Sequence, residues 1–214
     1  MGEYVCPDCF VYLSFDVKPI CLVCNRHTYT GFTHEKCRAR YVIDGAFSSI
    51  VFGRVAKKLV YRLKYKPFLH NLKDFMTDLF YEGLIQNEDF MRIRQEKALL
   101  VPIPLYKAKF NQRGYNQAAY LAQGIGDKFS LPTVDILERV RATSPQSRLH
   151  RDERRENIKG AFKIACSDGK NVQGKTLFLV DDVLTSGATL AEAASILKRA
   201  GAEKVYGLTL AHGE

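Results

Sequence analysis

Apolar positions along the chain follow two alternating patterns, one typical of buried strands and the other typical of helices. Continuous runs of β-branched, aromatic and aliphatic residues predict strands within residues 41–52, 98–103, 176–180 and 204–210. Between these runs, apolar residues recur every three or four positions, which predicts helices at residues 53–65, 72–83, 115–129 and 190–200. Strands that alternate with helices indicate a parallel sheet with helices on both faces. The pattern therefore predicts an α/β fold.

Five of the six cysteines lie in the first 37 residues, in a spacing typical of a metal site. Two CxxC pairs are separated by eleven residues, and an HxxC pair follows them. The candidate ligands are Cys6, Cys9, Cys21, Cys24, His34 and Cys37. Two residues between thiolates allow one tight turn to direct both sulfur atoms at a single ion, and zinc takes four such ligands. We therefore predict a structural zinc site in which either the first CxxC pair or the HxxC pair joins the second CxxC pair.

The length of 214 residues allows one core domain with a small appendage. We place the boundary at the end of the cysteine-rich segment, which gives a zinc-binding module over residues 1–40 and a larger domain over residues 41–214. The remaining cysteine, Cys166, is expected to be a small buried apolar residue. No apolar run approaches the roughly 20 residues that a membrane span needs, and the N-terminus lacks a signal sequence. These features predict a cytoplasmic protein with no membrane span.

The formal net charge of +9 is concentrated in two stretches. Residues 54–66 hold six basic residues and no acidic one, and residues 139–159 hold seven basic and three acidic residues. A basic excess of this kind favours polyanionic partners such as nucleic acid or phosphorylated metabolites, although a solvated basic face has the same composition. Tyr61 and Tyr65 lie among these charges, where they either stack on the bases of single-stranded DNA or pack in the core.

The most informative segment follows the third apolar run. Asp181 and Asp182 come directly after this strand, at the end where open α/β sheets bind ligands. A loop of small residues comes next: Thr185, Ser186, Gly187, Ala188 and Thr189. Thr189 and Glu192 have the spacing of a capping box, which predicts a helix that begins after Thr189. Because a helix N-terminus presents free backbone N–H groups, we expect the loop to bind a phosphate and the two carboxylates to accept hydrogen bonds from ribose hydroxyls.

This segment resembles the signature with which type I phosphoribosyltransferases bind 5-phosphoribosyl 1-diphosphate (PRPP). Two further motifs, Val101-Pro-Ile-Pro104 and Arg113-Gly-Tyr-Asn-Gln117, resemble the VPxP and RGFNQ motifs of the ComF family of competence-associated proteins. The basic segment 139–159 and the CxxC pairs resemble other parts of that family, with Tyr115 in place of the usual Phe and His34 where relatives often carry Cys. The resemblance covers nearly the whole chain. It implies a type I phosphoribosyltransferase fold, a parallel sheet flanked by helices, preceded by a small zinc-ribbon-like module.

The resemblance also implies roles for individual residues. Asp181 and Asp182 would hold the ribose 2- and 3-hydroxyls, and the loop 185–189 would hold the 5-phosphate. Lys107 and Arg113 are candidate cations for the leaving pyrophosphate, and Mg²⁺ would bridge ribose and pyrophosphate oxygens. The basic segment 139–159 would cover the site and exclude water.

Two functions are compatible with these features. The first is an enzyme that binds PRPP, or another ribose 5-phosphate compound, and transfers the phosphoribosyl group to an acceptor. The alternative, implied by the family's link to natural transformation, is a non-catalytic protein that binds single-stranded DNA and acts in DNA uptake with other competence proteins. We favour the enzyme, because it rests on named residues whereas the alternative rests on net charge and resemblance.

Overall fold

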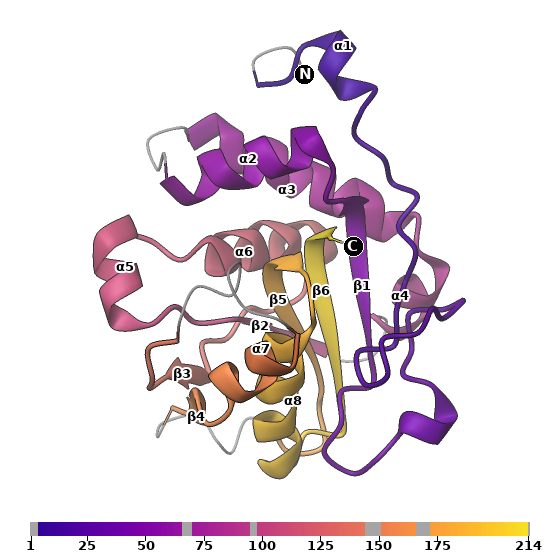
Figure 1. Cartoon of the computed structure of the whole chain (residues 1–214), viewed down its shortest axis with the longest axis vertical. Coiled ribbons are helices and arrows are strands. Elements are labelled where there is room, and N and C mark those ends of the chain that lie inside the picture. The colour runs from indigo at the N-terminus through magenta and orange to yellow at the C-terminus, as the bar shows by residue number, and fades with distance from the viewer. Residues whose placement is uncertain (1–3, 66–69, 95–97, 144–150, 166–171, 214) are drawn as a thin grey trace.

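The computed structural model describes residues 4–65, 70–94, 98–143, 151–165 and 172–213. Its centre is a sheet of four parallel strands in the order β1-β6-β5-β2. The strands span Gly45–Val51 (β1), Ala98–Pro102 (β2), Thr176–Leu184 (β5) and Lys204–His212 (β6). Figure 1 shows them in the middle of the molecule, surrounded by helices. The prediction for Cys166 falls outside the described residues.

Helices cover both faces of the sheet. Helices α3 and α6 pack on one face of the sheet and on each other, and α2 and α4 complete that layer. Helix α8 packs on the opposite face, beside α7. The helices span Arg54–Tyr65 (α2), His70–Ile85 (α3), Glu88–Ile93 (α4), Gln117–Phe129 (α6), Arg151–Ile158 (α7) and Ala188–Arg199 (α8). Along β5, Phe178 and Val180 face the α3 and α6 layer, whereas Leu177 and Leu179 face α8. This alternation is the period of two that a strand buried on both faces requires.

Two further parts of the chain lie beside the main sheet. Strands β3 (Leu137–Arg139) and β4 (Phe162–Ile164) form a separate antiparallel pair, which brings the ends of the basic segment 139–159 together. The N-terminal segment, with the short helices α1 (Pro7–Phe10) and η1 (Glu35–Cys37), runs along the β1 edge of the sheet (Figure 1). None of the helices in the described part of the chain is both long enough and apolar enough to cross a bilayer.

The α/β fold predicted from the apolar pattern is confirmed, and the predicted strands and helices are all present. The pattern does not reveal α4 and α5 (Lys107–Arg113), because six and seven residues are too few to show a helical period. The predicted capping box is wrong. Helix α8 begins at Ala188, two residues earlier than predicted, with Gly187 at a φ of 71° as its N-terminal cap. Glu192 instead accepts a hydrogen bond from the N–H of Gly160.

Candidate functional site

A cavity of about 410 Å³ opens at the carboxyl ends of β2 and β5, where an open parallel sheet is expected to bind ligands. Its wall comes from α2, the segment after β2, α5, the first turn of α6, the ends of β3 and β5, and the first turn of α8. Of the residues singled out from the sequence, the wall contains Arg113, Arg139, Asp181, Asp182, Thr185, Gly187, Ala188 and Thr189. Folding therefore brings the predicted motifs to one place.

The two acidic residues at the end of β5 have different surroundings. Asp182 is buried, and Nζ of Lys64 in α2 lies 2.9 Å from each of its carboxylate oxygens. Asp181 is half-buried, and its carboxylate accepts a hydrogen bond of 2.8 Å from the backbone N–H of Asp182. Burial, followed by repulsion from Asp182, raises the pKa of Asp181 to about 7. Asp181 therefore gains its negative charge near neutral pH.

Basic side chains outnumber acidic ones around the cavity. Lys64, Lys109, Arg113 and Arg139 all line the wall, together with the two carboxylates of β5. Among the described residues, no carboxylate lies within ion-pair distance of Lys109 or Arg113. Burial, followed by repulsion from Arg139 and Arg113, lowers the pKa of Lys109. Cations that crowd together without matching carboxylates favour an anionic ligand.

Helix α5 turns Lys109, rather than the predicted Lys107, towards the cavity. Lys107 is exposed and does not line the wall, whereas Lys109 and Arg113 both do. These two residues are four positions apart, so they lie on the same face of the helix. The guanidinium of Arg113 also lies over the ring of Tyr65, 5.3 Å from its centroid. In so short a helix, the sequence does not show which of several basic residues faces inward.

Gln117 is a further polar residue of the wall, to which the sequence motifs assigned no role. Around it, Gly114 ends α5 with a φ of 76°, and Asn116 caps α6 by accepting a hydrogen bond from the N–H of Ala118. Asn116 also donates to the carbonyl of Ile103, 3.0 Å away, which ties α6 to the segment after β2. Gln117 itself is 2% exposed, and neither polar atom of its amide has a hydrogen-bond partner in the part of the chain that the structure describes. Because buried amides are normally hydrogen-bonded, we expect a ligand to supply the partner.

The loop before α8 forms the opposite edge of the cavity. Gly187 is the N-terminal cap of α8, and Thr185, Ala188 and Thr189 line the wall with it. Ser186 is buried instead, and its hydroxyl oxygen accepts a hydrogen bond of 3.4 Å from the N–H of Ala188. The first turn of a helix carries a partial positive charge and backbone N–H groups that no helical carbonyl satisfies. This edge of the cavity therefore suits an anion.

A second candidate site lies in the N-terminal segment. The ligand atoms of four side chains all lie within 4.8 Å of one another, and these are Cys21, Cys24, His34 and Cys37. Sγ of Cys24 is 3.3 Å from Nδ1 of His34, while Nε2 of His34 donates to the carbonyl oxygen of His27, 3.1 Å away. That second hydrogen bond leaves Nδ1 as the nitrogen that faces the sulfur atoms. Three thiolates and one imidazole in this arrangement could hold a tetrahedral metal ion such as zinc.

Backbone hydrogen bonds shape the turn of residues 21–24, which we call the knuckle. The N–H of Cys21 donates to the carbonyl of Arg26 at 2.9 Å, and the N–H of Asn25 donates to the carbonyl of Cys21 at 2.7 Å. The structure groups the knuckle with the HxxC pair, which was one of the two alternatives left open by the sequence. Cys6 and Cys9 are exposed and lie outside this group, at α1, which Figure 1 shows at the top of the molecule beyond α2.

Comparisons with known proteins find a phosphoribosyltransferase domain in the C-terminal part of the chain and relatives that match almost its whole length. A family model described as phosphoribosyl transferase domain matches residues 115–213. The DNA utilization protein YhgH of Escherichia coli O157:H7 is 36% identical over 220 residues, which cover 94% of this chain and 93% of that protein. Competence protein F of Haemophilus influenzae is 38% identical over 115 residues, and the match spans 50% of that protein. Competence protein ComFC of Bacillus subtilis is 26% identical over 219 residues, 97% of this chain and 84% of that protein.

The parallel sheet, the cavity at its carboxyl end and the family match define a protein with a phosphoribosyltransferase domain. The similarity to YhgH extends over almost the full length of both chains. The chain therefore belongs to the ComF family, as its motifs predict.

Proposed function

We propose that the cavity at the ends of β2 and β5 binds PRPP with Mg²⁺ and that the protein transfers the phosphoribosyl group to an acceptor. The observation that supports this most is the charge around the cavity, where four basic side chains accompany two carboxylates beside the N-terminus of α8. PRPP matches this arrangement, because it joins a ribose diol to a 5-phosphate and a diphosphate. A diol donates hydrogen bonds to carboxylates, and phosphates bind cations and helix N-termini.

Each part of PRPP then has a partner on the wall. Asp181 and Asp182 accept hydrogen bonds from the ribose 2- and 3-hydroxyls, and the backbone of loop 185–189 holds the 5-phosphate. Lys109 and Arg113 face the leaving pyrophosphate, where Mg²⁺ supplies further charge neutralisation. The unpartnered amide of Gln117 hydrogen-bonds to a phosphate or hydroxyl oxygen of the same ligand.

Phosphoribosyl transfer breaks the bond between C1 of ribose and a pyrophosphate oxygen and forms a bond between C1 and the acceptor. The transition state has oxocarbenium character, so the protein acts mainly by orienting the ribose and by stabilising the charge that develops on pyrophosphate. Lys109 and Arg113 have no carboxylate partner among the described residues, so their charge is directed at this leaving group.

We also propose that Cys21, Cys24, His34 and Cys37 bind a structural zinc ion. Every donor is a thiolate or an imidazole, and four of them complete a tetrahedral site with no position left for a substrate. The described part of the N-terminal segment has only short helices before β1, and metal binding stabilises segments of this kind that lack a core of their own.

Thermal unfolding with and without Mg²⁺-PRPP tests the proposed ligand. We expect PRPP to raise Tm, because a ligand that binds only the folded protein adds about 1.4 kcal/mol for each tenfold excess over Kd. Combining Asp181→Asn with Asp182→Asn should abolish the shift and leave a folded protein. The control is Asp127→Asn on the exposed side of α6, which should keep the full shift. A full shift in the double variant, or none in the unmodified protein, would overturn the proposal.

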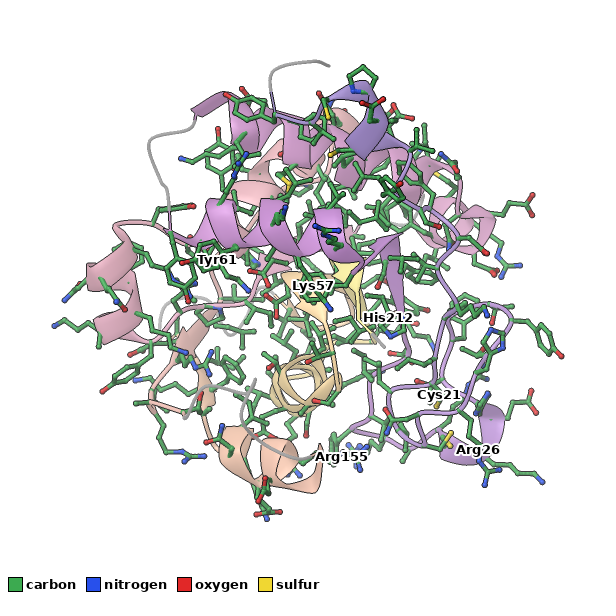
Figure 2. The ribbon with its side chains drawn as sticks, turned by 45° about the horizontal axis from the view of Figure 1, so that its top comes forward. Cys21, Arg26, Lys57, Tyr61, Arg155 and His212 are labelled. Carbon is green, nitrogen blue, oxygen red and sulfur yellow. The ribbon has the colours of Figure 1, made fainter. Side chains whose placement is uncertain are left out.

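A specific surface supports a second candidate function, the binding of single-stranded DNA. Tyr61 and Tyr65 of α2 are 60% and 53% exposed, and their ring centroids are 4.7 Å apart. Tyr65 also lines the cavity, so the aromatic pair is continuous with the proposed PRPP site. Figure 2 shows Tyr61 and Lys57 on this helix, which carries the first basic stretch. Exposed rings among cations bind single strands without sequence preference, and the relatives' names, DNA utilization and competence, point to DNA uptake as the process.

Fluorescence anisotropy with a labelled single-stranded oligonucleotide tests this second function. The logarithm of the association constant should fall linearly with the logarithm of salt concentration, by about 0.7 per phosphate neutralised. Tyr61→Ala and Tyr65→Ala should each weaken binding by about 1–3 kcal/mol, while Tyr29→Ala, at a ring 97% exposed elsewhere, should not. Unchanged affinity in both α2 variants would exclude this surface. Release of pyrophosphate from PRPP on addition of an acceptor separates the enzyme from a protein that only binds.

A further inference from the structure

The knuckle packs directly on the loop that begins α8. Leu22, which lies between Cys21 and Cys24, is 2% exposed. A Cβ atom added to Gly187 would lie 2.8 Å from Cδ2 and 3.2 Å from Cδ1 of Leu22. The two segments are therefore in van der Waals contact, and a larger residue at position 187 would force the side chain of Leu22 to shift. Gly187 is also the residue whose φ of 71° sets the direction of the loop and the start of α8.

Polar contacts hold the knuckle against α7 as well. Nη2 of Arg155 in α7 donates to the carbonyl of Val23 at 2.8 Å, and Figure 2 shows Arg155 between α7 and the segment that carries Cys21. The N–H of Gly160, just after α7, donates to Glu192 of α8 at 2.7 Å. The knuckle thus lies between the loop and the end of the basic segment 139–159, and it contacts both.

We propose that Leu22 is a positioning residue, through which the metal site holds loop 185–189 in the conformation that binds the 5-phosphate. The proposal rests on the proposed function of the cavity. Metal binding closes the turn that carries Leu22, and Leu22 limits the movement of Gly187, the residue of the loop with the greatest backbone freedom. Without the metal, the knuckle loses its link to His34 and Cys37 and keeps only its hydrogen bonds, so Leu22 limits the loop less.

Two consequences distinguish this role from simple structural support. Metal removal should weaken phosphate binding although no metal ligand lines the cavity wall. Phosphate binding should in turn strengthen metal retention, because coupling between two binding sites is reciprocal. Coupling of this kind typically changes affinity by about 5–150-fold.

Isothermal titration of the zinc-loaded protein with Mg²⁺-PRPP tests the first consequence. Leu22→Ala should weaken PRPP binding by about 5-fold or more. The matched control is Leu197→Ala, which truncates a fully buried leucine of the same apolar cluster at the far end of α8, and should change the affinity by less than about 2-fold. Equal affinity in Leu22→Ala and the unmodified protein, or an equal loss in the control, would refute the positioning role.

Zinc release into excess chelator tests the reciprocal consequence without any activity measurement. Mg²⁺-PRPP should slow zinc release about 5-fold or more in the unmodified protein and have a smaller effect in Leu22→Ala. Equal slowing in both proteins would contradict the coupling.

A double-variant cycle keeps the inference testable if PRPP itself does not bind. Gly187→Ala should speed zinc release by the free protein, because its Cβ collides with Leu22. In the Leu22→Ala background, the same substitution should have a smaller effect, because the collision is gone and only the strain of the positive φ at Gly187 remains. If PRPP does not bind but the cycle shows this coupling, the proposed ligand is wrong and the contact is real. If Gly187→Ala releases zinc at the unmodified rate, the inference itself is wrong.

Discussion

Nζ of Lys64 lies 2.9 Å from both carboxylate oxygens of Asp182, across 118 positions of sequence. The side chains are 26% and 10% exposed, so the pair is largely shielded from water. It ties α2 to the end of β5 at the wall of the cavity. A lysine that belongs to the first basic stretch of the sequence therefore balances one of the acids proposed to hold the ribose.

Lys64→Met should destabilise the protein by about 1–3 kcal/mol, because it leaves the buried carboxylate of Asp182 without its cation. Urea unfolding at neutral pH measures the change. Lys58→Met, at an exposed position of the same helix, is the matched control and should stay within about 0.5 kcal/mol of the unmodified protein. Equal stability of the two variants would show that the ion pair contributes nothing.

Asp181 should make stability depend on pH. Its pKa of about 7 in the folded protein lies above the ordinary value of 3.8, so the folded state binds this proton more tightly than the unfolded state. The stability that protonated Asp181 contributes is fully present below about pH 4 and is lost as the pH rises through 7. Asp181→Asn removes the loss and should raise the free energy of unfolding at pH 8 by about 1 kcal/mol or more, since one pKa unit corresponds to about 1.4 kcal/mol.

Chemical unfolding of both proteins from pH 4 to pH 8 measures this dependence. The difference in stability between Asp181→Asn and the unmodified protein should grow across that range. A constant difference would mean that the pKa of Asp181 is the same in the folded and unfolded states.

Gln117→Met should weaken the binding of Mg²⁺-PRPP by about 10-fold or more while the protein stays at least as stable. Among the described residues, no protein group bonds to the amide, so replacing it with an apolar side chain of similar length breaks no hydrogen bond within that part of the protein. One lost hydrogen bond to a charged ligand is worth about 1.5–3 kcal/mol. Titration calorimetry measures the affinity, and Gln123→Met on the exposed face of α6 is the control. A variant that binds PRPP normally would show that Gln117 does not touch the ligand.

Zinc content should follow the cluster of Cys21, Cys24, His34 and Cys37. Cys37→Ser should lower the zinc bound per chain, because a tetrahedral site loses one of its thiolates. The double variant Cys6→Ser with Cys9→Ser should keep the full amount, since these residues lie outside the cluster. Metal analysis of the purified proteins gives the result. Loss of zinc in the Cys6→Ser and Cys9→Ser double variant would show that these two cysteines are metal ligands.

The sequence by itself determined the four strands of the main sheet and four of the helices that cover it, and it predicted where along the chain a ligand site lies. Apolar periods predict the strands and helices because they depend on backbone geometry that repeats over a few residues. The segment from Asp181 to Thr189 predicts a ligand site because its parts are also local: a strand, two acids, a loop of small residues and a helix follow one another directly in the sequence. The family follows from motifs in order along the chain, and full-length relatives confirm it.

Only the tertiary structure decided which side chains meet. Lys64, Lys109 and Gln117 reach the cavity from three different helices, and their direction depends on how those helices pack on the sheet. Two local signals could have revealed Gln117: its place in the motif Arg113-Gly-Tyr-Asn-Gln117 and its position on the apolar face of a helix. The choice of the HxxC pair over Cys6 and Cys9 also depended on packing, because both pairs have suitable spacing. The contact between Leu22 and Gly187 joins segments about 165 positions apart, and no local pattern specifies such a distance.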